Sequence, residues 1–400
     1  MLIGIVGKPN CGKTTFLNAA CLTTAKVADF PFTTIEPNPG IAYVRTECVC
    51  KEFNVKDNPK NSICKEGIRY VPVDLLDVAG LVPGASEGKG LGNKFLDDIR
   101  RADVLIHVID ASGSTDAEGR LVEAGAWDPL EDVKWLEQEI TLWLQNIIKR
   151  DWKKFSRKLE QEKLSFIETM KDRLSGLSIT KNHIIKAVKD CQLDSDKPSK
   201  WSEDEIYKFV SELRKISKPI IILANKVDNK KSEENIQRLN QLKDQIIVPG
   251  CALGEYFLRK YAEDGKIGYI PGNKSFEIIK QDEFNEKELG VLNNLQDLMN
   301  KYGSTGIQKV IDFAVFDILK MIIVFPVHDS HSLTDTDGNV LPDAYLVPEG
   351  TAIKEFAEKI HTDLAKNFIH GVNARDQKRL SDSYELKNLD VVRFVSAKRK

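Results

Sequence analysis

The stretch GIVGKPNCGKTTFL, residues 4–17, decides the fold of the N-terminal part of this 400-residue chain. It follows the pattern GxxxxGK[ST] through Gly7, Gly12, Lys13 and Thr14. An apolar run precedes the pattern and a helical periodicity follows it, which is the strand–loop–helix setting that a phosphate-binding loop requires. We therefore expect an α/β fold: a P-loop nucleotide-binding domain with a mostly parallel sheet.

The chemistry of phosphate binding explains these residue types. Glycines let successive backbone N–H groups point at a pyrophosphate, and the following helix adds the positive end of its dipole. Lys13 would reach the β- and γ-phosphates, and Thr14 would offer its hydroxyl to Mg²⁺. We expect nucleotide contacts from Gly7, Lys8, Pro9, Asn10, Cys11, Gly12, Lys13, Thr14 and Thr15. Kinases, ATPases and GTPases all use such a loop, so it does not select the base.

A second motif indicates guanine. The apolar run PIIILA, residues 219–224, ends in Asn225, Lys226 and Asp228, which form NKxD. A carboxylate at Asp228 can accept hydrogen bonds from guanine N1–H and from its exocyclic amine, whereas adenine has an acceptor at N1 and lacks that amine. Farther on, VPGCALGE resembles a loop whose backbone binds the guanine carbonyl, here at Cys251 and Ala252, although serine is usual where Cys251 stands.

Two further segments have the pattern of nucleotide-dependent switches. Asp77 and Gly80 form DxxG after an apolar strand, where Asp77 would hold Mg²⁺ through water and the Gly80 N–H would contact the γ-phosphate. Upstream, DFPFTTIEPNPG contains Thr33 and Thr34, and we favour Thr34 as the residue that closes over the metal; the alternative is an ordinary proline-bounded loop. We expect catalysis to involve Lys13, Thr34, Asp77 and Gly80, and Mg²⁺ to be bound by Thr14, Thr34 and Asp77.

Together with DVAGLVPGASEGKGLGNKFLDDIRRAD, residues 77–103, the DFPFTTIEPNPG segment resembles the Obg-type translation-associated GTPases, specifically an archaeal-type member of the YchF-like branch. The resemblance covers nearly the whole chain and includes YGSTGIQ at residues 302–308. It implies a cytoplasmic protein that contacts the ribosome or RNA. Bacterial members of the branch often alter NKxD and accept ATP, but the motif is intact here, so GTP is the expected nucleotide.

Two residues bear on the rate of hydrolysis. Leu81 stands after DxxG, where many GTPases carry a glutamine that orients water, and leucine cannot do so. Slow intrinsic hydrolysis is expected. In potassium-stimulated relatives an asparagine at the position of Asn10 helps to hold a monovalent cation, so we hypothesise that K⁺ replaces an arginine finger; the alternative is that Asn10 is only a turn residue.

About a hundred residues separate the strand VLIHVIDAS from NKxD, which is more than a crossover needs. An apolar stripe that begins at Val133 and extends to Met170 predicts an inserted helical hairpin, and Ser202 with Glu205 predicts a capping box. From residue 321 onward, strand and turn signals predict a compact β-grasp domain that resembles the TGS domain of these GTPases. The expected domains are residues 1–120 and 202–319 for the GTPase domain, 121–201 for the helical insertion and 320–400 for the TGS-like domain.

Basic residues from Arg150 to Lys158 lie near tryptophans such as Trp152, which could form an RNA-binding arm. The alternative, which we favour, is that the tryptophans pack the helices and the charges form a solvated face. A net charge of −2 gives the whole chain no nucleic-acid bias, so no DNA partner is expected. No apolar run is long enough to suggest membrane insertion, and an N-terminus without signal-peptide features favours the cytosol.

Three cysteines, Cys48, Cys50 and Cys64, cluster before the DxxG strand. They would bind zinc only with a fourth ligand, for which Asp57 is the nearest candidate. We favour free thiols and commit to no metal site beyond Mg²⁺, with K⁺ as a hypothesis; whether these cysteines bind a metal stays open.

The sequence thus favours a GTPase that acts as a slow, nucleotide-dependent switch on the ribosome or RNA. Two alternatives remain open. One is an ATPase that acts on a small molecule or protein client, and the other is a nucleotide-sensing scaffold with negligible turnover.

Overall fold

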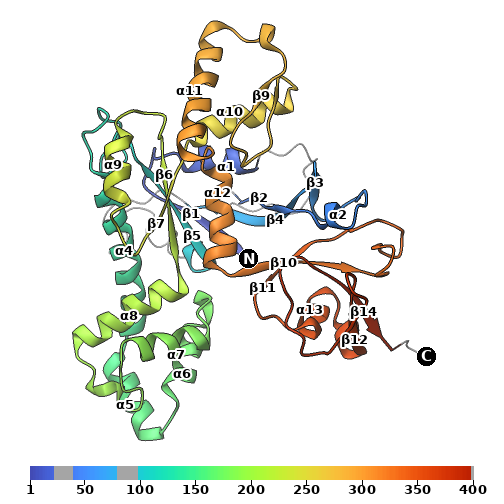
Figure 1. Cartoon of the computed structure of the whole chain (residues 1–400). Helices are drawn as coiled ribbons and strands as arrows, with labels where there is room; N and C mark the ends of the chain where they lie inside the picture. Colours follow the sequence, from blue (N-terminus) through green and yellow to red (C-terminus); the bar gives the residue numbers. More distant parts are fainter. Residues whose placement is uncertain (22–38, 79–97, 398–400) are drawn as a thin grey trace. The chain divides into compact units, whose positions relative to one another are not determined.

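The computed structural model describes residues 1–21, 39–78 and 98–397, and these form two compact units (Figure 1). Among the described residues, the first unit contains 1–21, 39–41, 74–78 and 98–310, and the second contains 42–73 and 311–397. The three-part division expected from the sequence stays a prediction. No helix among the described residues is both long enough and apolar enough to cross a membrane.

A seven-stranded sheet carries the nucleotide-binding motifs. Its order is β2-β4-β1-β5-β6-β7, with β3 on β4, and the pairs β4-β1, β1-β5, β5-β6 and β6-β7 are parallel. Every residue of β5 is buried, as expected for a parallel strand covered on both faces. The strands are β1 Leu2–Val6, β2 Pro39–Glu47, β3 Ile63–Lys65, β4 Ile68–Asp77, β5 Val104–Asp110, β6 Ile220–Asn225 and β7 Ile246–Pro249. The predicted α/β class with a mostly parallel sheet is confirmed.

Helices on this sheet position the loops that follow its strands. Leu136 and Ile140 of α4 pack against Val6 of β1 and Leu105 of β5 in one apolar cluster, and α1 packs against α10. Besides the inserted helices α5 to α7, the helices of this unit are α1 Lys13–Cys21, α4 Pro129–Lys149, α8 Glu203–Ser217, α9 Ser232–Leu239, α10 Ala252–Glu263, α11 Glu286–Tyr302 and α12 Ile307–Asp312, which runs on into the second unit. A short pair of strands is formed by β8 Ile267–Gly268 and β9 Glu277–Ile278.

Helices are present in the predicted insertion, but the apolar stripe predicted for a hairpin is divided over α4 and the two helices that follow it. After α4, the chain forms α5 Trp152–Glu162, α6 Phe166–Arg173 and α7 Lys181–Asp190, which gather beside α8 in Figure 1. Asp151 and Lys163 adopt left-handed backbone conformations, with φ of 56° and 52°, and this is where the helices separate. The predicted capping box of Ser202 and Glu205 begins α8.

Tryptophans pack the core of this helical region. Trp152 and Trp201 are both buried, their ring centroids lie 5.6 Å apart, and Phe166 contacts both rings. Trp135 instead packs on the cluster that joins α4 to the sheet. The packing interpretation of the tryptophans is therefore the correct one for these residues, while Lys153 and Arg157 on α5 are exposed.

The second unit is built on a five-stranded sheet of order β11-β10-β14-β12-β13, in which β10 and β14 are parallel. Its elements are β10 Met321–Val327, β11 Tyr345–Pro348, α13 Ile353–Ile360, α14 Thr362–Lys366, β12 Phe368–Asn373, β13 Arg379–Leu380 and β14 Asp390–Ser396. The helices α13 and α14 are separated at His361, whose φ of −161° is extended. Residues 42–73, which include β3 and α2 Val49–Glu52, belong to the same unit.

Candidate functional site

The phosphate loop lies between β1 and α1, with two glycines in conformations that other residues rarely adopt. Gly7 has φ of 145° and Gly12 has φ of 104°. A Cβ on Gly7 would lie 2.3 Å from the Val108 carbonyl oxygen, and one on Gly12 would lie 2.3 Å from Nδ2 of Asn225. Both positions therefore require glycine for conformational and for steric reasons.

The lysines of the loop have different surroundings. Lys13 Nζ donates to the Lys8 carbonyl oxygen at 2.9 Å across the loop, so its ammonium group lies where the loop curls. Lys8 is itself 2% exposed, and its Nζ forms an ion pair with Asp132 at 2.8 Å and lies 5.0 Å from the Trp127 ring centroid. Lys8 thus anchors the loop to the start of α4, a role that the sequence motif did not predict.

Asp77, at the end of β4, has the surroundings of a group that binds a cation. Its Oδ2 accepts a hydrogen bond from the Thr14 hydroxyl at 3.0 Å. Its Oδ1 is buried without a hydrogen-bond partner among the described residues, and burial raises the pKa of the carboxyl. A hydroxyl and a carboxylate are ligands suited to Mg²⁺, and an ion or its bound water would satisfy the buried oxygen. The residues present therefore fit magnesium.

Asn225, at the end of β6, joins the phosphate loop to the loop after β7. Its Nδ2 donates to the Cys11 carbonyl oxygen at 2.9 Å, and its Oδ1 accepts from the Ala252 N–H at 3.0 Å. Residues separated by more than 200 positions are thereby held at one edge of the sheet. This is the edge at the carboxyl ends of parallel strands, where α/β folds bind ligands.

Cys251 orients the carboxylate that would bind the base. Its Sγ lies 3.3 Å from Asp228 Oδ1 and accepts from the Gly254 N–H at the start of α10, so the thiol caps this helix. Burial, with the nearby Asp228 charge, raises the pKa of the thiol, which therefore stays protonated and donates to Asp228. The cysteine performs both hydrogen-bonding tasks expected of a serine at this position.

A serine should accordingly replace Cys251 with little loss. We expect Cys251→Ser to keep nucleotide affinity within about threefold, because its hydroxyl supplies the same donor and acceptor, whereas Cys251→Ala should lower the free energy of unfolding by about 1 kcal/mol through the lost cap. Titration with a fluorescent guanine nucleotide and thermal unfolding would measure both. Equal behaviour of the two variants would contradict this account.

Lys226 is held by an acidic group that sequence reasoning missed. Its Nζ contacts Asp110 Oδ2 at 2.9 Å, and Asp110 is fully buried at the end of β5, where Ser112 also donates to it at 2.6 Å. Hydrogen bonds from Ser112 and Lys226 outweigh burial and hold the pKa of Asp110 below its usual range. In the sequence, the position of Asp110 at the end of an apolar strand was the feature that could have indicated its role.

The segment YGSTGIQ supports the loop after β7. Thr305 accepts the Cys251 N–H through its carbonyl oxygen at 2.9 Å, and its hydroxyl donates to Glu255 of α10. Gly306 has φ of 84°, and a Cβ there would lie 2.1 Å from the Pro249 carbonyl oxygen. These contacts hold the segment against the loop after β7.

The remaining predicted residues lie at the tip of the phosphate loop, at the start of α1 or outside the described residues. Pro9 and Asn10 are at the tip of the phosphate loop, where Asn10 has φ of 60° and its Nδ2 donates to the Gly119 carbonyl oxygen at 2.9 Å. Thr15 is half-buried at the start of α1. The predicted switch residues Thr33, Thr34, Gly80 and Leu81 lie outside the described residues.

Comparisons with known proteins agree with this geometry. Family models match for a 50S ribosome-binding GTPase at residues 2–143, for an Obg-like GTPase YGR210-like, G4 motif-containing domain at residues 223–329, and for a TGS domain at residues 337–396. An uncharacterized GTP-binding protein of Methanocaldococcus jannaschii is 47% identical over 398 residues, covering 99% of each chain.

Two other relatives extend the comparison. A ribosome-binding ATPase YchF of Buchnera aphidicola is 28% identical over 370 residues, which cover 92% of this chain and 86% of that protein. The crystal structure of a GTP binding protein from Pyrococcus horikoshii OT3 matches with a TM-score of 0.79 and 36% identity, over 99% of this chain and 100% of that one. This chain therefore belongs to the YchF-like branch of the Obg family of P-loop nucleotide hydrolases.

Proposed function

We propose that this chain binds GTP with Mg²⁺, hydrolyses it slowly to GDP and phosphate, and uses the bound nucleotide to control reversible contact with the ribosome or its RNA. The observation that most supports GTP over other nucleotides is the exposed Asp228 carboxylate. The Cys251 thiol orients it, beside the Asn225 side chain that joins both nucleotide loops. This carboxylate would bind the two donors on the guanine edge.

An ATPase is the second candidate, because relatives in the same family are named ribosome-binding ATPases. Equilibrium titrations with GTP and ATP distinguish the two. We expect GTP to bind at least about 10²-fold more tightly, since ATP would leave the Asp228 carboxylate without its donors. Comparable affinities would favour the ATPase, and multiple-turnover assays that release no phosphate would favour a nucleotide-sensing scaffold.

Potassium is expected to stimulate hydrolysis. Leu81 supplies no water-orienting group, and in the proposal a K⁺ ion beside the side-chain amide oxygen of Asn10 provides the missing positive charge. Turnover in KCl should exceed turnover in NaCl by about tenfold or more. Asn10→Gly, which tolerates the positive φ but lacks the oxygen, should abolish the difference. Equal rates of the unchanged protein in the two salts would refute the proposal.

The proposed ribosomal contact has a candidate surface on α5. Lys153, Lys154, Arg157 and Lys158 are all exposed there, beside a buried core that holds the helix in place. Such a basic face would contact phosphates and would make binding sensitive to salt. Because the proposed partner is the ribosome, we propose that the protein acts in the cytosol.

Co-sedimentation with ribosomal subunits tests this function. The protein would be loaded with a non-hydrolysable GTP analogue, with GDP or with nothing, and binding is expected only with the analogue. A Lys153→Glu/Arg157→Glu variant should bind about tenfold more weakly, whereas the matched control Lys186→Glu/Lys189→Glu on α7 should bind normally. Binding that ignores the nucleotide, or no binding at all, would remove support for a ribosomal switch.

A further inference from the structure

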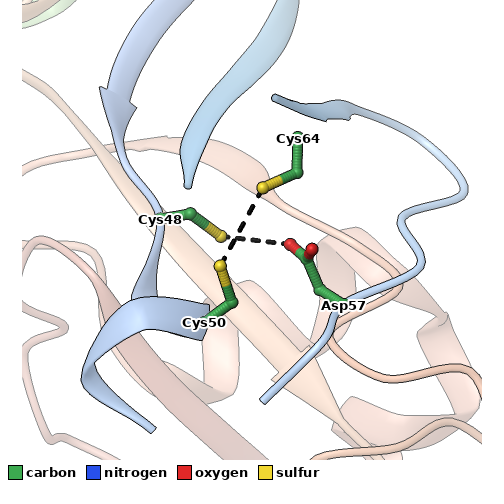
Figure 2. A group of neighbouring side chains, drawn as sticks. All are labelled: Cys48, Cys50, Asp57 and Cys64. Carbon is green, nitrogen blue, oxygen red and sulfur yellow. Dashed lines mark hydrogen bonds between the residues drawn. The ribbon is translucent and has the colours of Figure 1, made fainter. Parts of the chain in front are cut away.

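Three cysteines and an aspartate converge in the second unit. Cys48 immediately precedes α2, Cys50 lies within α2, Cys64 is on β3, and Asp57 lies in the loop between α2 and β3. Figure 2 shows the four side chains pointing toward one another. One ligand atom from each lies within 4.8 Å of all the others.

Two distances within this cluster are close to those expected around a tetrahedral ion. Zinc–sulfur bonds of about 2.3 Å place two sulfurs about 3.8 Å apart, and a sulfur and an oxygen about 3.5 Å apart. The Sγ atoms of Cys50 and Cys64 are 3.9 Å apart, and Cys48 Sγ is 3.2 Å from Asp57 Oδ2. Four ligand atoms this close leave room for one ion and not for a multi-iron cluster.

We propose that Cys48, Cys50, Cys64 and Asp57 bind one zinc ion as a closed, structural site. Thiolates favour zinc over magnesium or calcium, and four protein ligands leave no position open for a substrate. This site is independent of the proposed nucleotide chemistry. It also revises the expectation of free thiols.

A buried arginine completes the surroundings. Arg69 is fully buried, its Nη2 is 2.8 Å from Asp57 Oδ2 and its Nε is 3.4 Å from Cys48 Sγ. Three thiolates, a carboxylate and Zn²⁺ would leave two negative charges, and the guanidinium offsets one of them. The same Nη2 donates to the Leu341 carbonyl oxygen, so this second layer extends to the C-terminal part of the unit. Outer contacts of this kind orient metal ligands.

The ion would hold a loop that joins two distant parts of the chain. Between Asp57 and Cys64, the N–H of Asn58 donates to the Val340 carbonyl oxygen at 3.0 Å and that of Lys60 donates to Pro342 at 2.7 Å. Fixing both ends of this short loop would lower the entropy cost of that pairing. The proposed role is therefore to stabilise the joining of residues 42–73 to the C-terminal sheet.

Elemental analysis of the full-length protein, purified without chelator, tests the site. We expect about one zinc ion per chain, and cobalt substitution should give the thiolate charge-transfer and tetrahedral ligand-field bands. Cys64→Ser should lose the metal, while the control Cys191→Ser, which replaces a buried cysteine outside the cluster, should keep it. Hydrogen exchange at Asn58 and Lys60 should accelerate when zinc is removed.

Two measurements keep the proposal testable if Cys64→Ser fails to fold. Asp57→Asn retains all three sulfurs and should shift the cobalt ligand-field bands, and a mercurial reagent added to the unchanged protein should release zinc as its thiols react. Metal-free protein with free thiols, or zinc retained by Cys64→Ser, would overturn the site. A Cys50–Cys64 disulfide found by peptide mapping in place of metal would also overturn it.

Discussion

Replacing Asp228 by asparagine is expected to weaken GTP binding by about 10²- to 10⁴-fold and to transfer affinity to xanthosine triphosphate. In the proposed complex the carboxylate would accept from two guanine donors, whereas an asparagine amide would present its own N–H₂ group to one of them. Xanthine carries a carbonyl where guanine has the amine, so the amide can donate to it. The Cys251 thiol should keep the new side chain in place, since it can donate to an amide oxygen as it does to the carboxylate.

Competition titrations with GTP, xanthosine triphosphate and ATP would measure this change in specificity. Asp264→Asn is the matched control, because Asp264 is an exposed aspartate at the other end of α10 and should leave all three affinities unchanged. Unaltered GTP affinity in Asp228→Asn would show that the base lies elsewhere and would remove the argument for a GTPase.

Local motifs predicted the α/β class because each motif is formed by residues that are close together in the sequence. The phosphate loop needs one strand, two glycines and a helix start, all within residues 2–21. The strand at Met321–Val327 and the capping box at Ser202 have the same local character. Asp110 and Asp132 were missed because their partners, Lys226 and Lys8, lie more than a hundred positions away.

Features that depend on distant segments were beyond sequence reasoning. The apolar stripe of the insertion continues through Asp151 and Lys163, so periodicity did not reveal the left-handed residues that separate α4, α5 and α6. Nothing near residues 42–73 indicates that they pack with the C-terminal sheet, since their partners begin at residue 311. By contrast, the sequence did indicate Cys48, Asp57 and Cys64 as candidate ligands, but their spacing could not show that their side chains converge.

A substitution at Asp77 is expected to slow GTP hydrolysis without lowering the stability of the folded protein. Asp77→Asn keeps the shape of the side chain and an oxygen that can accept from Thr14, but it removes the charge that would hold Mg²⁺. We expect the rate of GTP hydrolysis to fall by about 10²- to 10³-fold. Added Mg²⁺ should no longer increase nucleotide-dependent thermal stability.

Without nucleotide, the same variant should unfold at an equal or higher temperature. Burial raises the pKa of Asp77 in the folded protein, so the ionised carboxylate destabilises the fold as pH rises through that pKa, and a neutral amide avoids this cost at pH 7. Asp74→Asn, an exposed position on the same strand, is the control and should change neither property. Normal GTP hydrolysis by Asp77→Asn would exclude Asp77 from the metal site. A lower unfolding temperature of this variant would show that the carboxylate stabilises the folded protein.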